Sequence, residues 1–383
     1  MAKARWLAPW RDSFTKPAIY HCISRVVDRR FVFGPSEKEK LRTHLRMQEN
    51  FSGCKVLAYC LMSNHIHLLL EVPPRPLDGI SDAVLLERLG ALYSEATVAE
   101  VAAELKLAHE SENPIAVEKI HARYEYRMHD LGEFMKGWLQ RFTQWFNRSH
   151  ERTGGLWEDK FKSVIVEDGH AAKTMAAYID LNPVRAGMAV DPAEYRWSSY
   201  GEAIGGGPKG NGKKARAGLV RALRMHRGTP ADAQHWAGDV EVEYRKILLE
   251  GAVEKTEERV VRKSDGKEQV ETKVLRKGAA RECRGEGVGE NPGKAVGNAR
   301  SKDAGEANEP SGAMPGHVMM RHRIRYFTDG VVIGSRGFVD EVFARCRNRL
   351  GDRRKTGARK LRGAAAEVGG DKLWSLRDLK KQV

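Results

Sequence analysis

The stretch that decides the fold is Val56-Leu57-Ala58-Tyr59-Cys60-Leu61-Met62-Ser63-Asn64-His65-Ile66-His67-Leu68-Leu69-Leu70-Glu71-Val72. Two apolar runs flank the turn-prone pair Ser63-Asn64, which predicts a β-hairpin. Alternate side chains of a strand share a face, so four apolar residues of the second run would pack into a core: Ile66, Leu68, Leu70 and Val72. His65 and His67 would share the opposite face, with Cα atoms about 7 Å apart. Two imidazoles on one face can bind one metal ion.

A second group of polar side chains lies in the segment Tyr178-Ile179-Asp180-Leu181-Asn182. The preceding residues 171–178 are rich in helix formers. A helix would place Tyr178 and Asn182 on one face, because they are four residues apart. Pro183 is expected to end or kink that helix. The alternative is purely structural, with a core aromatic and a residue that ends the helix.

Four segments that occur in one order carry a family resemblance: 57–71, 156–163, 178–187 and 197–200. The last two read Tyr178-Ile179-Asp180-Leu181-Asn182-Pro183-Val184-Arg185-Ala186-Gly187 and Trp197-Ser198-Ser199-Tyr200. Together they resemble the single-tyrosine HUH transposases, in particular the REP-associated tyrosine transposases of bacteria. Residues 20–25 resemble the first strand of that family. The resemblance implies an α+β fold with a ferredoxin-like (RRM-like) palm and an antiparallel sheet.

The same resemblance implies the chemistry. Tyr178 would attack a phosphorus atom of single-stranded DNA, release a 3′-hydroxyl and form a 5′-phosphotyrosine. His65, His67 and Asn182 would bind a divalent metal ion, and this ligand set is compatible with Mg²⁺ or Mn²⁺. The ion would polarise the phosphate. The phenol, with an ordinary pKa near ~10, needs activation, and the sequence identifies no base.

Composition predicts a nucleic-acid partner. The formal net charge is +15, and Lys and Arg neutralise phosphates. Residues 316–383 hold 17 Lys and Arg against 7 Asp and Glu, a surplus of 10 positive charges. We predict an accessory DNA-binding module there, with a solvated basic tail as the alternative. The residues predicted to bind DNA are Arg25, Lys160, Lys162, Arg185, Arg353, Arg354 and Lys355.

The chain divides into regions of different character. The transposase-like domain is expected over 12–200, with strands at 18–27, 55–62, 65–72 and 161–167, and helices at 36–49 and 131–146. This βαββαβ order is that of a ferredoxin-like fold. Within it, 73–117 reads as a helical insertion. A helical segment is predicted over 216–251. A disordered linker is predicted over 252–315, which contains no Phe, Trp or Tyr.

Some classes of protein are disfavoured. No run of about 20 apolar residues predicts a membrane span, and the N-terminus lacks the apolar part of a signal peptide. The five cysteines form no CxxC pair, which fits reduced thiols rather than a zinc site or a disulfide framework. We therefore expect a cytoplasmic, nucleoid-associated bacterial protein, either a monomer or a homodimer.

Three functions compete. The first is a metal-dependent nuclease and strand transferase acting on single-stranded DNA with hairpin repeats. The second is a catalytically silent regulator that binds DNA hairpins with the same palm. The third, an RNA-binding protein, needs aromatic stacking residues where His65 and His67 lie. The presence of Tyr178 and Asn182 beside the histidine pair favours the first. A replication initiator or relaxase would share the histidine pair, but the match over 178–187 argues against it.

Overall fold

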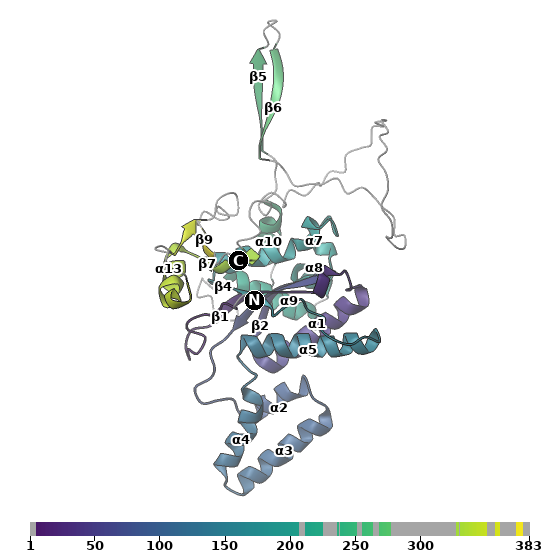
Figure 1. Ribbon diagram of the computed structural model, residues 1–383, viewed down its shortest axis with the longest axis vertical. Helices are drawn as coiled ribbons and strands as arrows, with labels where there is room; N and C mark the ends of the chain where they lie inside the picture. The colour runs from purple at the N-terminus through teal and green to yellow at the C-terminus, as the bar shows by residue number, and fades with distance from the viewer. Residues whose placement is uncertain are drawn as a thin grey trace.

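A central sheet organises the computed structural model, which describes residues 5–206, 211–224, 236, 238–250, 255–262, 268–276, 327–328, 330–350, 357–360 and 373–377. The sheet has seven strands in the order β2-β3-β1-β4-β7-β9-β8 (Figure 1). Its strands are β1 (Ala18–Arg25), β2 (Lys55–Leu61), β3 (His65–Val72), β4 (Lys162–Val166), β7 (Gly330–Gly334), β8 (Arg359–Lys360) and β9 (Trp374–Arg377).

The first four strands form the predicted palm. Together with α1 (Pro35–Ser52) and α5 (Leu131–Ser149) they follow the chain order βαββαβ. β1 pairs antiparallel with both β3 and β4, and β2 pairs antiparallel with β3. The spatial order β2-β3-β1-β4 is that of a ferredoxin-like sheet. The α+β, ferredoxin-like fold predicted from the sequence is therefore confirmed.

One face of the palm packs against α1 and α5. The predicted alternation holds, since the apolar residues of β3 on this face are buried beside Leu41 and Leu45 of α1. The buried apolar residues of α5 lie in the same cluster: Leu131, Phe134, Met135, Trp138, Leu139, Phe142 and Phe146. Trp138 donates a hydrogen bond from Nε1 to the Leu41 carbonyl at 3.0 Å. These aromatic side chains are therefore core residues, and Phe142 and Trp138 are fully buried.

The opposite face, which carries the two histidines, is covered as well. Its helices are α6 (His170–Asp180), α7 (Asn182–Arg185), α8 (Ser199–Gly205), α9 (Asn211–Arg224) and α10 (Gly238–Glu250). Arg221 of α9 forms a partly buried ion pair with Glu71 of β3. Gly218 lets α9 approach β2 closely, because a Cβ there would lie 2.2 Å from the Val56 carbonyl oxygen. The palm thus lies between two helical layers (Figure 1).

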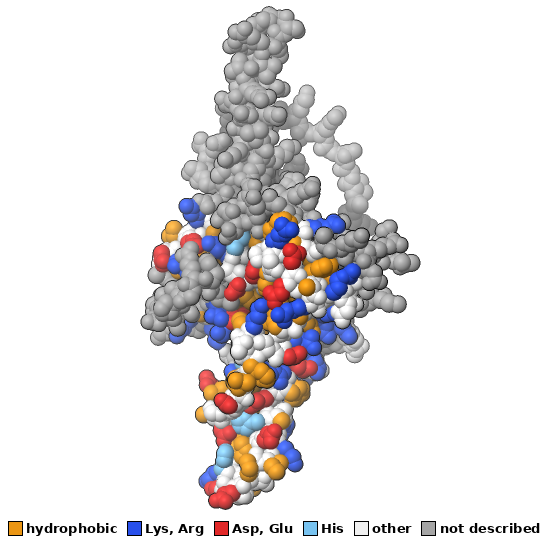
Figure 2. All heavy atoms as spheres, turned by 90° about the vertical axis from the view of Figure 1, so that its left-hand side faces the viewer, with side chains coloured by type: hydrophobic (Ala, Val, Ile, Leu, Met, Phe, Trp, Pro, Cys, Tyr) orange, Lys and Arg blue, Asp and Glu red, His pale blue; other side chains and the backbone are white. Residues whose placement is uncertain are grey.

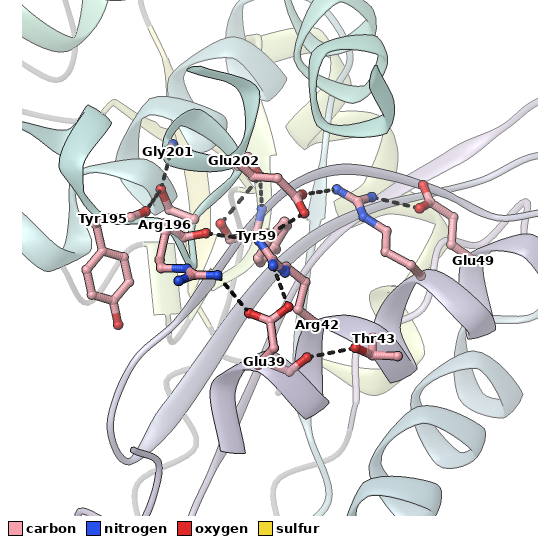
Figure 3. Close-up of polar contacts among 12 residues, drawn as sticks. Glu39, Arg42, Thr43, Glu49, Tyr59, Tyr195, Arg196, Gly201 and Glu202 are labelled. Atoms are coloured by element: carbon pink, nitrogen blue, oxygen red, sulfur yellow. Dashed lines mark hydrogen bonds and ion pairs between the residues drawn. The ribbon is translucent and has the colours of Figure 1, made fainter. Parts of the chain in front are cut away.

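The Trp197-Ser198-Ser199-Tyr200 segment has a structural role. The Ser199 hydroxyl accepts a hydrogen bond from the Tyr59 N–H at 2.5 Å, and the Ser198 hydroxyl accepts one from Gly201 at 3.1 Å and so caps α8. Glu202 then reaches α1, where its carboxylate pairs with Arg46 at 2.6 Å and Arg42 at 3.4 Å (Figure 3). The side chain of Glu202 is fully buried, so its carboxylate and the two guanidinium groups each need the opposite charge to be stable in the interior.

The insertion forms a separate lobe below the palm (Figure 1). It consists of α2 (Asp82–Gly90), α3 (Glu95–Glu110) and α4 (Pro114–Glu125), which share their own apolar cluster. Residues 82–125 hold 9 Asp and Glu against 4 Lys and Arg, and Figure 2 shows acidic and histidine side chains on its surface. An acidic surface repels DNA phosphates, so this lobe is poorly suited to binding them.

The region after 252 differs from the sequence prediction in two ways. Within the supposedly disordered linker, β5 (Lys255–Arg262) and β6 (Glu268–Arg276) form an antiparallel hairpin. Its register sets Val260 opposite Val270. The remaining residues of 252–315 lie outside the described parts of the chain.

The second difference concerns the basic region 316–383. Its strand β7 pairs in parallel with β4, and β9 pairs with β7, so its described strands extend the palm sheet. Helix α13 (Arg336–Arg345) packs in the same cluster as α1 and α5. Burial of Val331, Val332 and Ile333 supplies the reason, because these residues cover palm surface. These elements therefore belong to the palm sheet, and an accessory DNA-binding role for the basic region stays a prediction.

The described residues also contain three short 3-10 helices: η1 (Val27–Arg29), η2 (Pro192–Glu194) and η5 (Arg347–Arg349). Across the described residues, every helix is too short or too polar to cross a membrane. Cys22, Cys54, Cys60 and Cys346 are free and buried.

Candidate active site on the histidine face

The strand register brings basic residues beside the histidine pair. Arg25 of β1 lies directly opposite His65 of β3, and Ile23 lies opposite His67. Lys162 of β4 lies opposite Ile23. Directly opposed residues point to the same side of a sheet. Arg25 and Lys162, both predicted to bind DNA, therefore lie on the histidine face.

The two histidines are close and are held in the neutral form. Their ring centroids lie 5.0 Å apart. Burial, with Arg25 nearby, lowers the pKa of His65 to about 4. Burial and the neighbouring His65 and His21 lower the pKa of His67 well below its ordinary value. Neutral imidazole is the form that binds metal ions.

Each histidine also has its Nδ1 atom engaged. His65 Nδ1 lies 2.6 Å from Asn64 Oδ1, and His67 Nδ1 lies 2.9 Å from His21 Nε2. Among the described residues, no hydrogen bond involves Nε2 of either ring. Metal-binding histidines commonly use one ring nitrogen for the ion and the other for such a partner.

Tyr178 lies on α6 against this pair. Its side chain is 1% exposed, and its ring centroid lies 5.9 Å from that of His67. Phe327 stacks on the tyrosine ring at 4.6 Å, and the guanidinium carbon of Arg185 lies 4.2 Å from the ring centroid. No hydrogen bond to the Tyr178 hydroxyl occurs within the part of the chain that the structure describes, so no neighbouring base is identified there.

Asn182 follows the end of the tyrosine helix, as the Pro183 signal predicts. Its amide nitrogen donates to the carbonyls of Tyr178 at 3.2 Å and Ile179 at 3.1 Å, which satisfies acceptors at the end of α6. Its Oδ1 accepts a hydrogen bond from Arg185. Asn182 therefore has the structural role of ending the helix, and its Oδ1 already accepts one hydrogen bond.

Asp180 fixes the end of the tyrosine helix. The carboxylate is fully buried, and it accepts hydrogen bonds from the Tyr200 N–H at 3.0 Å and the Tyr244 hydroxyl at 2.6 Å. Burial raises its pKa to about 7. Asp180 thereby ties α6 to α8 and α10, two residues away from the tyrosine that faces the histidines.

The side chains of the site include possible ligands of a metal ion. No group of three or more His, Cys, Asp or Glu side chains in the described residues has the geometry of a metal site. Neutral imidazole nitrogens and an amide oxygen are nevertheless ligand types that suit a divalent ion. Such an ion would need DNA oxygens or water to complete its coordination.

Residues 15–84 match the family model described as "Transposase IS200 like". Over these residues the chain is similar to IS200-like transposases. The resemblance that its sequence motifs indicate is thereby confirmed at the level of this family. The matched segment includes β1 to β3 and both histidines, and it ends before Tyr178.

A solved structure is also similar to this chain. It is described as "Structure of the REP associates tyrosine transposase bound to a REP hairpin", with 11% sequence identity and a TM-score of 0.34. The similarity covers 55% of this chain and 90% of that chain. No curated protein matches this chain.

Two residues of the site were not predicted from the sequence. His21 of β1 is fully buried between His67 and the Phe327 carbonyl. Its position in a predicted strand was visible, but its neighbour depends on the strand register. Phe327 is 306 residues from His21 along the chain, and no sequence signal connects it with the palm.

Some predicted DNA-binding residues lie elsewhere. Lys160 is exposed and lines a cavity of about 420 Å³ on the opposite face, together with Arg5, Arg11, Lys16 and Arg75. Lys160 precedes β4, which starts at Lys162, and its role in DNA binding stays a prediction. Arg353, Arg354 and Lys355 lie outside the described residues.

Proposed function

We propose that this chain is a transposase that cleaves and joins single-stranded DNA carrying hairpin repeats, through a 5′-phosphotyrosine and with a divalent metal ion. The observation that supports this best is the convergence of Tyr178, His67 and Arg185 on one face of the sheet. The family match supports a transposase-like role, and the motif resemblance supplies the hairpin substrate.

The proposed step starts from the phenol of Tyr178. Its Oη–P bond forms as the phenol loses a proton, and the P–O3′ bond breaks as the 3′-oxygen gains one. The reaction exchanges one phosphodiester for another, so a second 3′-hydroxyl can reverse it and join a new strand. The phosphotyrosine bond thereby conserves the energy of the broken phosphodiester for strand transfer.

The chain offers groups that would hold the metal and the phosphate. His65 and His67 would bind the ion through Nε2, and Asn182 through Oδ1. The ion, when bound, would polarise the phosphate. Asn182 is the weakest of these ligands, because its oxygen already accepts a bond from Arg185. Arg185 keeps Nη1 buried without a hydrogen-bond partner, and a guanidinium of this kind suits a phosphate oxygen.

Access to Tyr178 requires movement. The side chain is 1% exposed, and Phe327 covers one side of its ring. A phosphodiester must come within bonding range of Oη, so the groups that enclose the tyrosine have to shift when DNA binds. Phe327, which stacks on the tyrosine ring, is the natural group to move.

The test uses labelled single-stranded oligonucleotides from the repeats that flank the gene of this protein. Wild-type protein with Mg²⁺ or Mn²⁺ is expected to give a protein–DNA adduct on a denaturing gel. Tyr178→Phe should bind the same DNA without forming the adduct. Tyr126→Phe is the matched control, because Tyr126 also has an acceptor residue four positions later but is 54% exposed on another element.

Metal dependence is tested in the same assay. EDTA should stop adduct formation, and His65→Ala or His67→Ala should abolish it. Asn182→Ala should reduce it less, since water can replace a weak amide ligand. Full activity in EDTA, or an adduct formed by Tyr178→Phe, would contradict the proposal.

A second function is favoured by one observation, the enclosure of Tyr178. A silent regulator would bind DNA hairpins with the same face and leave the tyrosine covered. Hairpin binding by wild-type protein, with no adduct under any metal condition, would identify this alternative.

A further inference from the structure

We propose that His21 is a positioning residue: it holds the proton of His67 on Nδ1 and so presents the lone pair of His67 Nε2 to the metal ion. This inference rests on the proposed function, because it concerns the metal site of that reaction. His21 is not among the predicted site residues, and its partner Phe327 is distant from it in the sequence.

The backbone carbonyl of Phe327 determines which nitrogen of His21 is protonated. The Phe327 oxygen lies 2.9 Å from His21 Nδ1, and a carbonyl oxygen only accepts hydrogen bonds. His21 Nδ1 must therefore be the donor. A neutral imidazole has one N–H, so His21 Nε2 carries a lone pair and accepts.

The protonation of His21 in turn determines that of His67. His21 Nε2 lies 2.9 Å from His67 Nδ1, and an accepting Nε2 requires a donating Nδ1 on His67. The proton of neutral His67 is then on Nδ1, which leaves Nε2 unprotonated. The carbonyl of Phe327 thus determines, through His21, which nitrogen of His67 can bind a metal ion.

The packing around His21 holds this arrangement in place. His21 is fully buried, and its ring lies parallel to that of His67, with centroids 5.2 Å apart. Tyr178 meets His21 edge-on at 5.9 Å. Rotation of the His21 ring would disturb both neighbours and break both hydrogen bonds.

His65 shows the same pattern independently. Its Nδ1 lies 2.6 Å from Asn64 Oδ1, an amide oxygen that only accepts. His65 therefore also has its proton on Nδ1. Two different partners, one from the turn and one from β1, give both histidines the tautomer with a lone pair on Nε2.

The test compares two replacements of His21. His21→Gln offers an amide N–H for the Phe327 carbonyl and an oxygen for His67 Nδ1–H, whereas His21→Leu offers neither. Full-length protein is titrated with Mn²⁺, and free ion is measured by electron paramagnetic resonance. His21→Leu is expected to weaken Mn²⁺ binding 10- to 100-fold, the usual effect of losing such a partner, and His21→Gln should restore most of it. His44→Leu is the matched control, since it removes a buried histidine that packs on the other face of the sheet.

The tautomer can also be read without a variant at this position. Long-range ¹H–¹⁵N correlation spectra of histidine-labelled wild-type protein should show His67 protonated on Nδ1, with the resonance assigned from His67→Gln. An Nε2–H tautomer would overturn the inference, and so would unchanged Mn²⁺ affinity in His21→Leu.

The outcomes separate this inference from the proposed function. If His65→Ala and His67→Ala weaken Mn²⁺ binding but His21→Leu does not, only the role of His21 fails. If neither histidine variant changes Mn²⁺ binding, the metal site itself is wrong and the role of His21 falls with it.

Discussion

Replacement of Asp180 by Asn should change how stability depends on pH. The folded carboxyl has its pKa raised from 3.8 to about 7 by burial. Between these values the folded protein keeps a proton that the unfolded chain has lost, so stability falls as pH rises and levels off above about pH 7. The total effect is at most ~4 kcal/mol, from about 1.4 kcal/mol for each pKa unit. Roughly 2–3 kcal/mol of it falls between pH 5 and pH 8.

Asn at this position keeps the hydrogen bonds without the ionisation. Its oxygen can accept from the Tyr200 N–H, and its N–H₂ can donate to the Tyr244 oxygen. We therefore expect Asp180→Asn to gain roughly 2–3 kcal/mol over wild type between pH 5 and pH 8. The assay is urea unfolding followed by fluorescence at several pH values.

The control is Asp12→Asn, whose side chain is 86% exposed and should leave the pH profile unchanged. Parallel stability curves for wild type and Asp180→Asn across this range would refute the reasoning. A variant that loses stability at every pH by the same amount would show that Asp180 acts only through its hydrogen bonds.

Three further predictions concern other parts of the chain. Tyr178→Phe should change the unfolding free energy by no more than about 0.5 kcal/mol, because no described group hydrogen-bonds its hydroxyl, and a larger loss by urea unfolding would reveal a missed partner. Glu202→Gln should cost about 3–5 kcal/mol by leaving Arg42 and Arg46 poorly paired in the interior, whereas Glu39→Gln, with a side chain 42% exposed, should cost under about 1 kcal/mol. Replacing Arg353, Arg354 and Lys355 by Gln should make the slope of log K against log salt shallower by up to about 0.7 for each lost phosphate contact with single-stranded DNA. The same number of Gln replacements at Lys106, Lys119 and Arg123 in the acidic lobe should leave that slope unchanged, and equal slopes for both triple variants would reduce the basic tail to a solvated surface.

Periodicity predicted the palm well because each of its elements is amphipathic. The hairpin around Ser63-Asn64 could be read from alternation alone, since a shift of one residue would move Ile66 and Leu68 to the face of the two histidines. The apolar stripe of α5 predicted a packed helix for the same reason. The end of α6 followed from Pro183, which restricts the residue before it.

The C-terminal region could not be read in this way. Its composition suggested a separate basic module, because charge is visible in sequence whereas strand partners are not. β7 has five buried residues, and only the tertiary structure shows that two of them, Val332 and Ile333, pair with β4. The face on which Lys160 lies also depends on the tertiary structure, because β4 starts only at Lys162.

The sequence by itself determined the palm, the histidine pair and the tyrosine helix, because these depend on local periodicity and on motifs of a few residues. Only the tertiary structure decided which groups surround Tyr178. The contacts of His21 with His67 and Phe327 join residues 46 and 306 positions apart, and such contacts depend on strand register and on sheet order. Neither is encoded in local spacing, so the enclosure of the tyrosine and the orientation of His67 emerge only when the chain has folded.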